Sequence, residues 1–227
     1  WAAAVVVQFI HKTRPTRYVI IHPGDSGMCH PVNLARIESM KHGIVSSTSI
    51  MACCEGFDEF AEFANANPEL DYGVHLTLTC ESSNYNWGPV TPASEVPTLI
   101  ERNGRFWRTA PQVAANAKAE EVDRELRAQI DRVLEAGIKI SHLDNHMWSL
   151  LTRPDLIDVY VQLSLDYDLP IRYRKVEKLP LVQRGEFAGN LLVAYAEEGR
   201  RLKQHNMPIF DFVESNNYDV PPDEKRN

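Results

Sequence analysis

The sequence has few cysteines and lacks the cysteine patterns of a zinc finger or a disulfide-stabilised scaffold. Its 227 residues include four cysteines, and no CxxC pair is among them. Small secreted scaffolds and finger-type zinc sites need denser patterns than this. The chain is long enough to bury a hydrophobic core, so we expect the four cysteines to be small buried thiols. They are Cys29, Cys53, Cys54 and Cys80.

The sequence also lacks an excess of basic residues and a long apolar run. It has 24 Lys and Arg against 31 Asp and Glu, a formal net charge of −7. This charge disfavours nonspecific binding to nucleic acid or to anionic membranes. No apolar run reaches the roughly 20 residues of a membrane-spanning helix, so we expect no membrane span. We assign residues 1–16 to an N-terminal arm of unknown role. The sequence determines neither the compartment nor the oligomeric state, and it is compatible with a homo-oligomer.

Two motifs of common α/β enzymes are missing. No GxGxxG follows the first predicted strand, so a dinucleotide-binding fold would lack its fingerprint. No GxSxG nucleophile elbow is present either. Dinucleotide chemistry and serine hydrolysis are therefore the weaker interpretations of this chain.

What the sequence does contain is an alternation of strand-like and helix-like patterns. The predicted strands are 17–22, 43–51, 72–79, 138–144, 169–174 and 208–213, and the predicted helices are 31–41, 58–65, 113–136, 154–167 and 187–205. We expect the first strand to be buried, and a long loop over residues 81–111. The alternation predicts an α/β fold with a parallel sheet, either doubly wound or closed into a barrel.

Side chains that can bind a metal lie where three predicted strands end. Asp25 follows the first strand, His75 lies on the polar side of the third, and His146 ends the SHLDNH segment. One carboxylate and two imidazoles can hold a divalent ion such as Zn²⁺ or Mg²⁺ and leave positions open for water and substrate. A lone histidine on a strand is more often structural, but three such residues at the ends of strands indicate a candidate metal site.

Four more side chains are candidates for supporting roles. Asp144 could fix the tautomer of His146 or take a proton, or it could be a satisfied strand-end carboxylate. Arg172 could hold a carboxylate or a reaction oxyanion, or form an ordinary ion pair. Glu81 and Trp87 are candidates for substrate binding, and the region of Trp87 and Trp107 could supply a platform for stacking a sugar. Their alternatives are a solvated loop glutamate and plain aromatic packing.

Six segments, in a fixed order and spacing, cover most of residues 17–175. They are VIIHPGDSGMCHPVN (19–33), GIVSSTSIM (43–51), DYGVHLTLT (71–79), NWGPV (86–90), SHLDNHMW (141–148) and LPIR (169–172). Each alone is a weak signal, but the combination is specific. In this combination the chain resembles the YdjC-like carbohydrate deacetylases, also called the ChbG/HpnK family.

The resemblance implies a distorted (β/α) barrel related to polysaccharide deacetylases. It also implies metal-dependent hydrolysis of the amide C–N bond of N-acetylated sugars, with Asp25, His75 and His146 as metal ligands. The implied chemistry is attack of water on the acetamide carbonyl, with a carboxylate as base and an acid for the leaving amine. On this interpretation Asp25, Asp144 and Arg172 are the candidate catalytic residues.

The chain departs from the family in two places. Paired aspartates usually follow the first strand, the first of them placed to act as base, and here that position is Gly24. The late histidine near a His-Pro pair, thought to supply the acid, is also missing. We therefore expect residues 1–227 to form a single, incomplete barrel domain that lacks its last C-terminal elements.

Three functions are compatible with these residues. The first is a metal-dependent deacetylase of N-acetylated sugars or oligosaccharides, weakened by Gly24. The second is a noncatalytic carbohydrate-binding relative that keeps the barrel. The third is another metal hydrolase on the same barrel, such as an amidohydrolase or a phosphodiesterase. Release of acetate separates the first from the other two.

Overall fold

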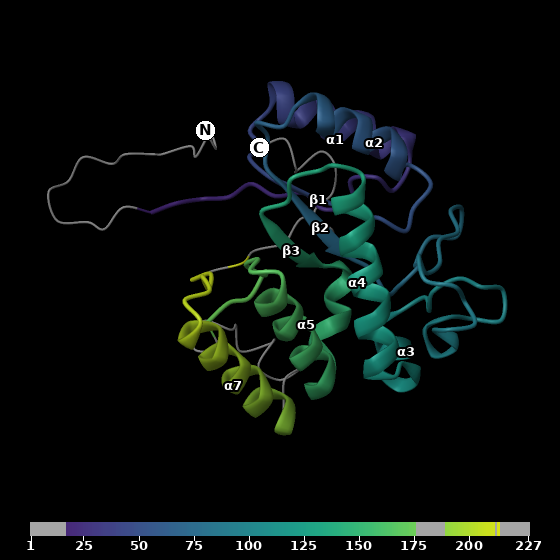
Figure 1. The fold of residues 1–227 in the computed structure, drawn as a ribbon, viewed down its shortest axis with the longest axis vertical. Coiled ribbons are helices and arrows are strands. Elements are labelled where there is room, and N and C mark those ends of the chain that lie inside the picture. The colour runs from purple at the N-terminus through teal and green to yellow at the C-terminus, as the bar shows by residue number, and fades with distance from the viewer. Residues whose placement is uncertain (1–16, 176–188, 212, 214–227) are drawn as a thin grey trace, which may run out of the picture.

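A parallel sheet forms the centre of the computed structural model, which describes residues 17–175, 189–211 and 213 (Figure 1). Its strands are β1 (Thr48–Ile50), β2 (Tyr72–Leu76) and β3 (His142–Asn145), in the order β1-β2-β3. Both pairings are parallel, so the strands end at the same edge of the sheet. The predicted α/β fold with a parallel sheet is confirmed, and the sheet is open over the described residues.

Isolated backbone bridges continue this sheet on both sides. They join Ser26 to Ile50 beyond β1, Leu143 to Ile171 beyond β3, and Arg174 to Phe210 further out. The predicted strands at 169–174 and 208–213 are therefore present only as single bridges, and residue 212 lies outside the described residues. The register within the sheet places His75 of β2 opposite Asp144 of β3.

Helices cover the sheet and connect its strands. They are α1 (His30–His42), α2 (Phe57–Ala66), α3 (Ala110–Asn116), α4 (Ala119–Glu135), α5 (Pro154–Asp166) and α7 (Asn190–Gln204), with the 3₁₀ turns η1 (Pro97–Leu99) and η2 (His146–Leu151). α4 packs on β2 and on α5, and α5 packs on α7. In Figure 1, α1 and α2 lie together at one end of the molecule, and α5 and α7 lie at the other. None of the described helices combines the length and apolar run needed to cross a bilayer.

The core lies where α4 meets the sheet. All five residues of β2 are buried. The apolar face of α4 has helical spacing, and each of its members is fully buried: Val122, Leu126, Ile130 and Val133. Burying one such side chain contributes about 1.5–3 kcal/mol before entropy is counted. All four cysteines are free, and Cys29, Cys54 and Cys80 are buried as expected, whereas Cys53 is only half-buried.

The predicted buried strand at 17–22 was wrong. This segment forms no strand, and Tyr18, Val19 and Ile20 are 74%, 58% and 55% exposed. An apolar run is buried only when another element covers it, and no described element covers these residues. Ladder pairing with β1 begins only at Ser26. The predicted arm, residues 1–16, lies outside the described residues.

The predicted helix at 113–136 is two helices, α3 and α4. The chain is extended at Ala117 and Lys118, which separate them. Arg153 stabilises the break, because its guanidinium donates to the carbonyls of Ala114 and Ala117 at 2.8 Å each. Carbonyls that would otherwise be unpaired at a helix end are thereby satisfied. This long-range contact has no signature in the helical periodicity.

Candidate metal centre

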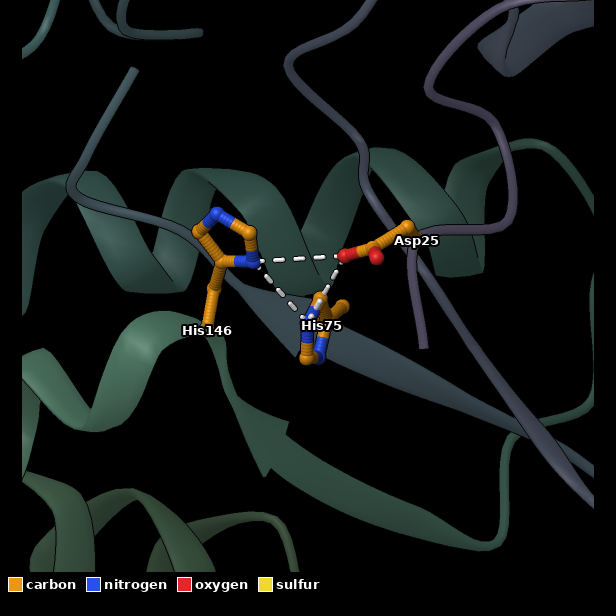
Figure 2. Close-up of side chains that lie close together, drawn as sticks. All are labelled: Asp25, His75 and His146. Atoms are coloured by element: carbon orange, nitrogen blue, oxygen red, sulfur yellow. Dashed lines mark hydrogen bonds and ion pairs between the residues drawn. The ribbon is translucent and has the colours of Figure 1, made fainter. Parts of the chain in front are cut away.

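Three polar side chains converge at the edge where the strands end (Figure 2). Asp25 Oδ1 lies 3.3 Å from His75 Nε2 and 3.3 Å from His146 Nδ1. The two ring nitrogens lie 3.1 Å apart. Both imidazoles are buried, and Asp25 is partly exposed. The structure therefore brings together the three side chains that the sequence predicted as metal ligands.

The spacing of these three atoms fits a divalent ion. Ligand atoms about 2.0–2.2 Å from one ion are about 2.8–3.6 Å apart when their bonds make angles of 90–109°. The observed separations of 3.1–3.3 Å lie within this range. Two imidazole nitrogens and a carboxylate oxygen are also the donor types that Zn²⁺ and related ions accept. The cluster could hold a metal ion, and its chemistry does not select which one.

A constrained turn delivers Asp25 to the cluster. Its backbone is in the left-handed region, with φ 65°. The next residue, Ser26, is fixed to β1: its amide donates to Ser49 O at 3.1 Å, and its carbonyl accepts from Met51 N at 2.7 Å. A left-handed conformation at a residue with a side chain costs about 1–2 kcal/mol and persists where surrounding contacts enforce it. The Ser26 bonds are such contacts.

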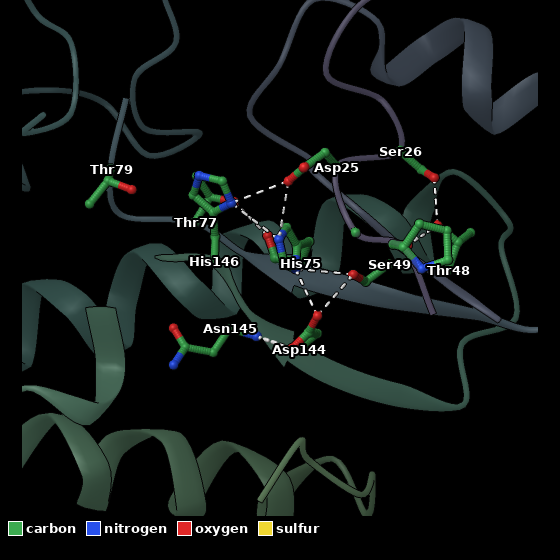
Figure 3. Close-up of polar contacts among 12 residues, drawn as sticks. Asp25, Ser26, Thr48, Ser49, His75, Thr77, Thr79, Asp144, Asn145 and His146 are labelled. Atoms are coloured by element: carbon green, nitrogen blue, oxygen red, sulfur yellow. Dashed lines mark hydrogen bonds and ion pairs between the residues drawn. The ribbon is translucent and has the colours of Figure 1, made fainter. Parts of the chain in front are cut away.

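His75 is oriented by groups on the two neighbouring strands (Figure 3). Its Nδ1 lies 3.0 Å from Ser49 Oγ and 3.2 Å from Asp144 Oδ2. A carboxylate at Nδ1 favours the tautomer that carries the proton there, which leaves Nε2 free to bind a metal. β2 thus presents His75 with the correct nitrogen facing Asp25.

His146 uses the opposite ring nitrogen. It follows β3 directly, and its Nδ1 faces the cluster while its Nε2 lies 3.0 and 3.1 Å from the carboxylate oxygens of Glu81. Glu81 therefore holds the proton at Nε2 and leaves Nδ1 for a metal. Two histidines thus turn different nitrogens inward, and each has a carboxylate at the other nitrogen.

The cluster attracts positive charge. Burial raises the pKa of the Asp25 carboxyl, but its hydrogen bonds to His146 and His75, together with the charges of these histidines, outweigh burial and hold the pKa well below its usual range. Burial lowers the pKa of His146, but Asp25 and Glu81 outweigh burial and raise the pKa to about 9. The same carboxylates that favour a proton here favour a metal cation in its place.

Asp144 is the most enclosed charged group of the site. It is 1% exposed, and its Oδ1 lies 2.7 Å from Arg172 Nε while its Oδ2 lies 3.3 Å from His22 Nε2. Burial raises the pKa of its carboxyl, but the charges and hydrogen bonds of His75, His22 and Arg172 hold the pKa well below its usual range. One of the alternatives for Asp144 was to fix the tautomer of His146, but in the structure it contacts His75, because the register pairs these two residues.

The other predicted site residues have different surroundings. Arg172 forms the ion pair with Asp144, which was one of the two alternatives for this residue. Glu81 contacts a histidine of the cluster. Trp87 is 4% exposed, and its indole N–H donates to Thr79 O at 2.7 Å. A buried ring cannot stack on a sugar, so the prediction of a platform at Trp87 conflicts with the structure.

The sequence analysis missed two serines. Ser47 Oγ lies 3.0 Å from His22 Nδ1, and Ser49 Oγ lies 3.1 Å from His22 Nε2. Ser49 also contacts His75. Both serines lie on one side of the 43–51 segment, because side chains alternate along an extended chain. That alternation was the available signal.

Gly24 faces the centre directly. A Cβ added to it would lie 2.9 Å from His75 Nε2 and 3.0 Å from His75 Cε1. Its φ is not positive, so its backbone would accept other residues. Any side chain at this position would therefore meet the nitrogen that His75 turns toward Asp25.

Comparisons with known proteins show the family to which this chain belongs. A family profile described as "YdjC-like protein" matches residues 18–222. A carbohydrate deacetylase of Brevibacillus brevis is 36% identical over 68% of this chain and 58% of its own length. A carbohydrate deacetylase of Thermoanaerobacter pseudethanolicus is 27% identical over 84% of this chain and 74% of its own length.

A solved structure shows the same fold. It comes from Enterococcus faecalis V583 and is described as a candidate cellobiose-phosphate cleavage protein, with a TM-score of 0.63 and 33% identity. The match covers 70% of this chain and 60% of that one. The chain thus spans about three fifths of the length of two of these three relatives. The profile match extends over most of the chain, and this protein belongs to the YdjC-like family.

Proposed function

We propose that this protein is a metal-dependent deacetylase of N-acetylated sugars with weak activity. The observation that carries this proposal is the cluster of Asp25, His75 and His146, in which both histidines are oriented by carboxylates. The relatives named carbohydrate deacetylase support the substrate class. A divalent ion held by the cluster would supply a Lewis acid that polarises the acetamide carbonyl and lowers the pKa of bound water to about 7.

None of the candidate residues at the site is well suited to act as the general base. Asp144 is 1% exposed and is engaged by Arg172 and His75, so it cannot reach a substrate. Asp25 is more exposed, but its lowered pKa makes it a weak base. Position 24, from which a side chain would point at His75, is glycine. General-base help is typically worth about 10²–10⁴-fold in rate, so we expect slow turnover.

In this proposal Asp144 and Arg172 position His75 and do not contact the substrate. Arg172 Nε pairs with Asp144, and its Nη2 donates to Asn145 O at 3.2 Å. These contacts hold the carboxylate that orients His75. Arg172 is therefore assigned the ion pair in preference to a reaction oxyanion.

One observation favours the second candidate function, a noncatalytic carbohydrate-binding relative. Because position 24 is glycine, no side chain at this position reaches His75 Nε2. A chain without a base could retain metal and sugar binding while losing turnover. Measurements of turnover and of binding separate the two candidates.

The test is acetate release from N,N′-diacetylchitobiose by the Zn²⁺-loaded protein, beside a His75→Ala, His146→Ala double variant. We expect slow release that depends on Zn²⁺ and is absent in the double variant. Equal release by both proteins would contradict the proposal. Sugar binding without any release by the unmodified chain would favour the noncatalytic candidate.

A further inference from the structure

A tryptophan follows His146 of the metal centre closely in the chain. Trp148 is two residues beyond His146, in the 3₁₀ turn that follows β3, and it is half-buried against the core. The guanidinium carbon of Arg172 lies 4.4 Å from the centre of its ring. Because Arg172 pairs with Asp144, and Asp144 contacts His75, an unbroken series of contacts joins this indole to the metal cluster.

The indole N–H of Trp148 differs from those of the other described tryptophans. Trp87 Nε1 donates to Thr79 O at 2.7 Å, and Trp107 Nε1 donates to Thr98 O at 2.8 Å. Among the described residues, no acceptor is found for Trp148 Nε1. A buried tryptophan usually finds a partner for its N–H within the protein, whereas Trp148 is half-buried. Its N–H is therefore a donor for which the described residues supply no acceptor.

The backbone that carries Trp148 is held in an unusual conformation. Met147 has φ 52° and Trp148 has φ 56°, so two successive residues with side chains are left-handed. Each costs about 1–2 kcal/mol, and conformations of this cost are concentrated at functional sites. Met147 is 48% exposed, so this turn, which begins at the ligand His146, reaches the surface.

We propose that Trp148, backed by Arg172, is the stacking platform for the sugar ring at this site. The apolar C–H face of a pyranose packs on an aromatic face, and the free N–H can donate to a sugar hydroxyl. Arg172 fixes the ring from one side and is itself fixed by Asp144. This inference rests on the proposed function and names the residue that selects its substrate class.

The test measures sugar binding apart from turnover. N,N′-diacetylchitobiose is titrated calorimetrically into the unmodified protein, Trp148→Ala, Trp148→Phe and Trp107→Phe. Removing a stacked aromatic partner should weaken binding roughly tenfold or more in Trp148→Ala. Trp148→Phe keeps a flat ring and should retain most of the affinity. Trp107→Phe is the matched control, because its indole is engaged by Thr98, and it should bind as the unmodified chain does.

Zn²⁺ affinity serves as the second measurement on the same variants. It should stay within about twofold in Trp148→Ala, which shows that the metal centre is intact. Equal sugar affinity in Trp148→Ala and the unmodified chain would overturn the platform and leave the proposed function standing. Failure of the unmodified chain to bind the sugar would overturn both the platform and the substrate class. The His75→Ala, His146→Ala variant should lose acetate release and still bind the sugar. This result would confirm that the metal cluster and the Trp148 platform contribute separately.

Discussion

The two histidines of the metal centre are oriented in similar ways but by very different parts of the molecule. Asp144, which orients His75, lies on β3 and is 1% exposed. Glu81, which orients His146, lies on the long segment after β2, and its side chain is 37% exposed. The contact of a carboxylate with a histidine nitrogen therefore lies in the core for His75, which we call the core side, and at the surface for His146, which we call the surface side. We infer that the His75 side contributes to stability, whereas the His146 side contributes mainly to function.

The largest effect that tests this comparison concerns the two carboxylates. Asp144→Ala leaves Arg172, His75 and His22 without their shared partner, and breaking a buried charge pair costs about 3–5 kcal/mol. Glu81→Ala removes a partly exposed contact and should cost less than about 1 kcal/mol. Urea denaturation measures both free energies of unfolding. Similar losses in the two variants would contradict the division into a core side and a surface side.

The second effect concerns His142, whose ring centre lies 5.0 Å from that of His22, a neighbour of Asp144. Burial, and then the charge of His22, lower the pKa of His142 from 6.5 to about 4. A histidine whose pKa is lowered by folding stabilises the fold above pH 6.5, and this contribution is lost as the pH falls through about 4. The shift corresponds to about 3 kcal/mol.

The measurement is the urea midpoint of the unmodified protein and of His142→Gln at pH 7 and at pH 4. Glutamine does not titrate, so the variant should lose less stability on acidification than the unmodified chain. A parallel decline of the two proteins would show that His142 does not contribute.

The smallest expected effect concerns Gly24, which faces His75. Gly24→Ala should weaken Zn²⁺ binding about tenfold, because the new Cβ lies 2.9 Å from His75 Nε2 and displaces this ligand. Gly24→Asp adds the same Cβ and a carboxylate, so comparing it with Gly24→Ala isolates the carboxylate. We expect acetate release to be at least about tenfold faster in Gly24→Asp than in Gly24→Ala. Equal rates would show that the missing carboxylate does not limit turnover.

The part of the site that was predictable from the sequence is the part governed by strand ends. Asp25, His75 and His146 follow or end strand-like runs, and parallel strands end at one edge of a sheet. Their convergence follows from that rule, although Asp25 follows a segment that forms no strand. The apolar face of α4 was also readable, because helical spacing specifies one face.

The remaining features depend on contacts between distant segments. The pairing of Asp144 with His75 follows from the register of β2 and β3, which no single strand encodes. The contact of Glu81 with His146 depends on how the segment after β2 folds back. Composition also could not distinguish the buried Trp87 from the half-buried Trp148, since both lie near glycine, proline or polar residues.

The turn at Asp25 has an evolutionary consequence. This ligand lies outside the regular strands and helices, and the buried apolar face of α4 and the residues of β2 stabilise the fold without it. Substitutions in the turn can therefore accumulate while the core still folds and remains recognisable. Gly24, one residue away, is one such position. Members of this family should thus diverge in catalytic rate sooner than in core sequence, and activity has to be measured in each of them.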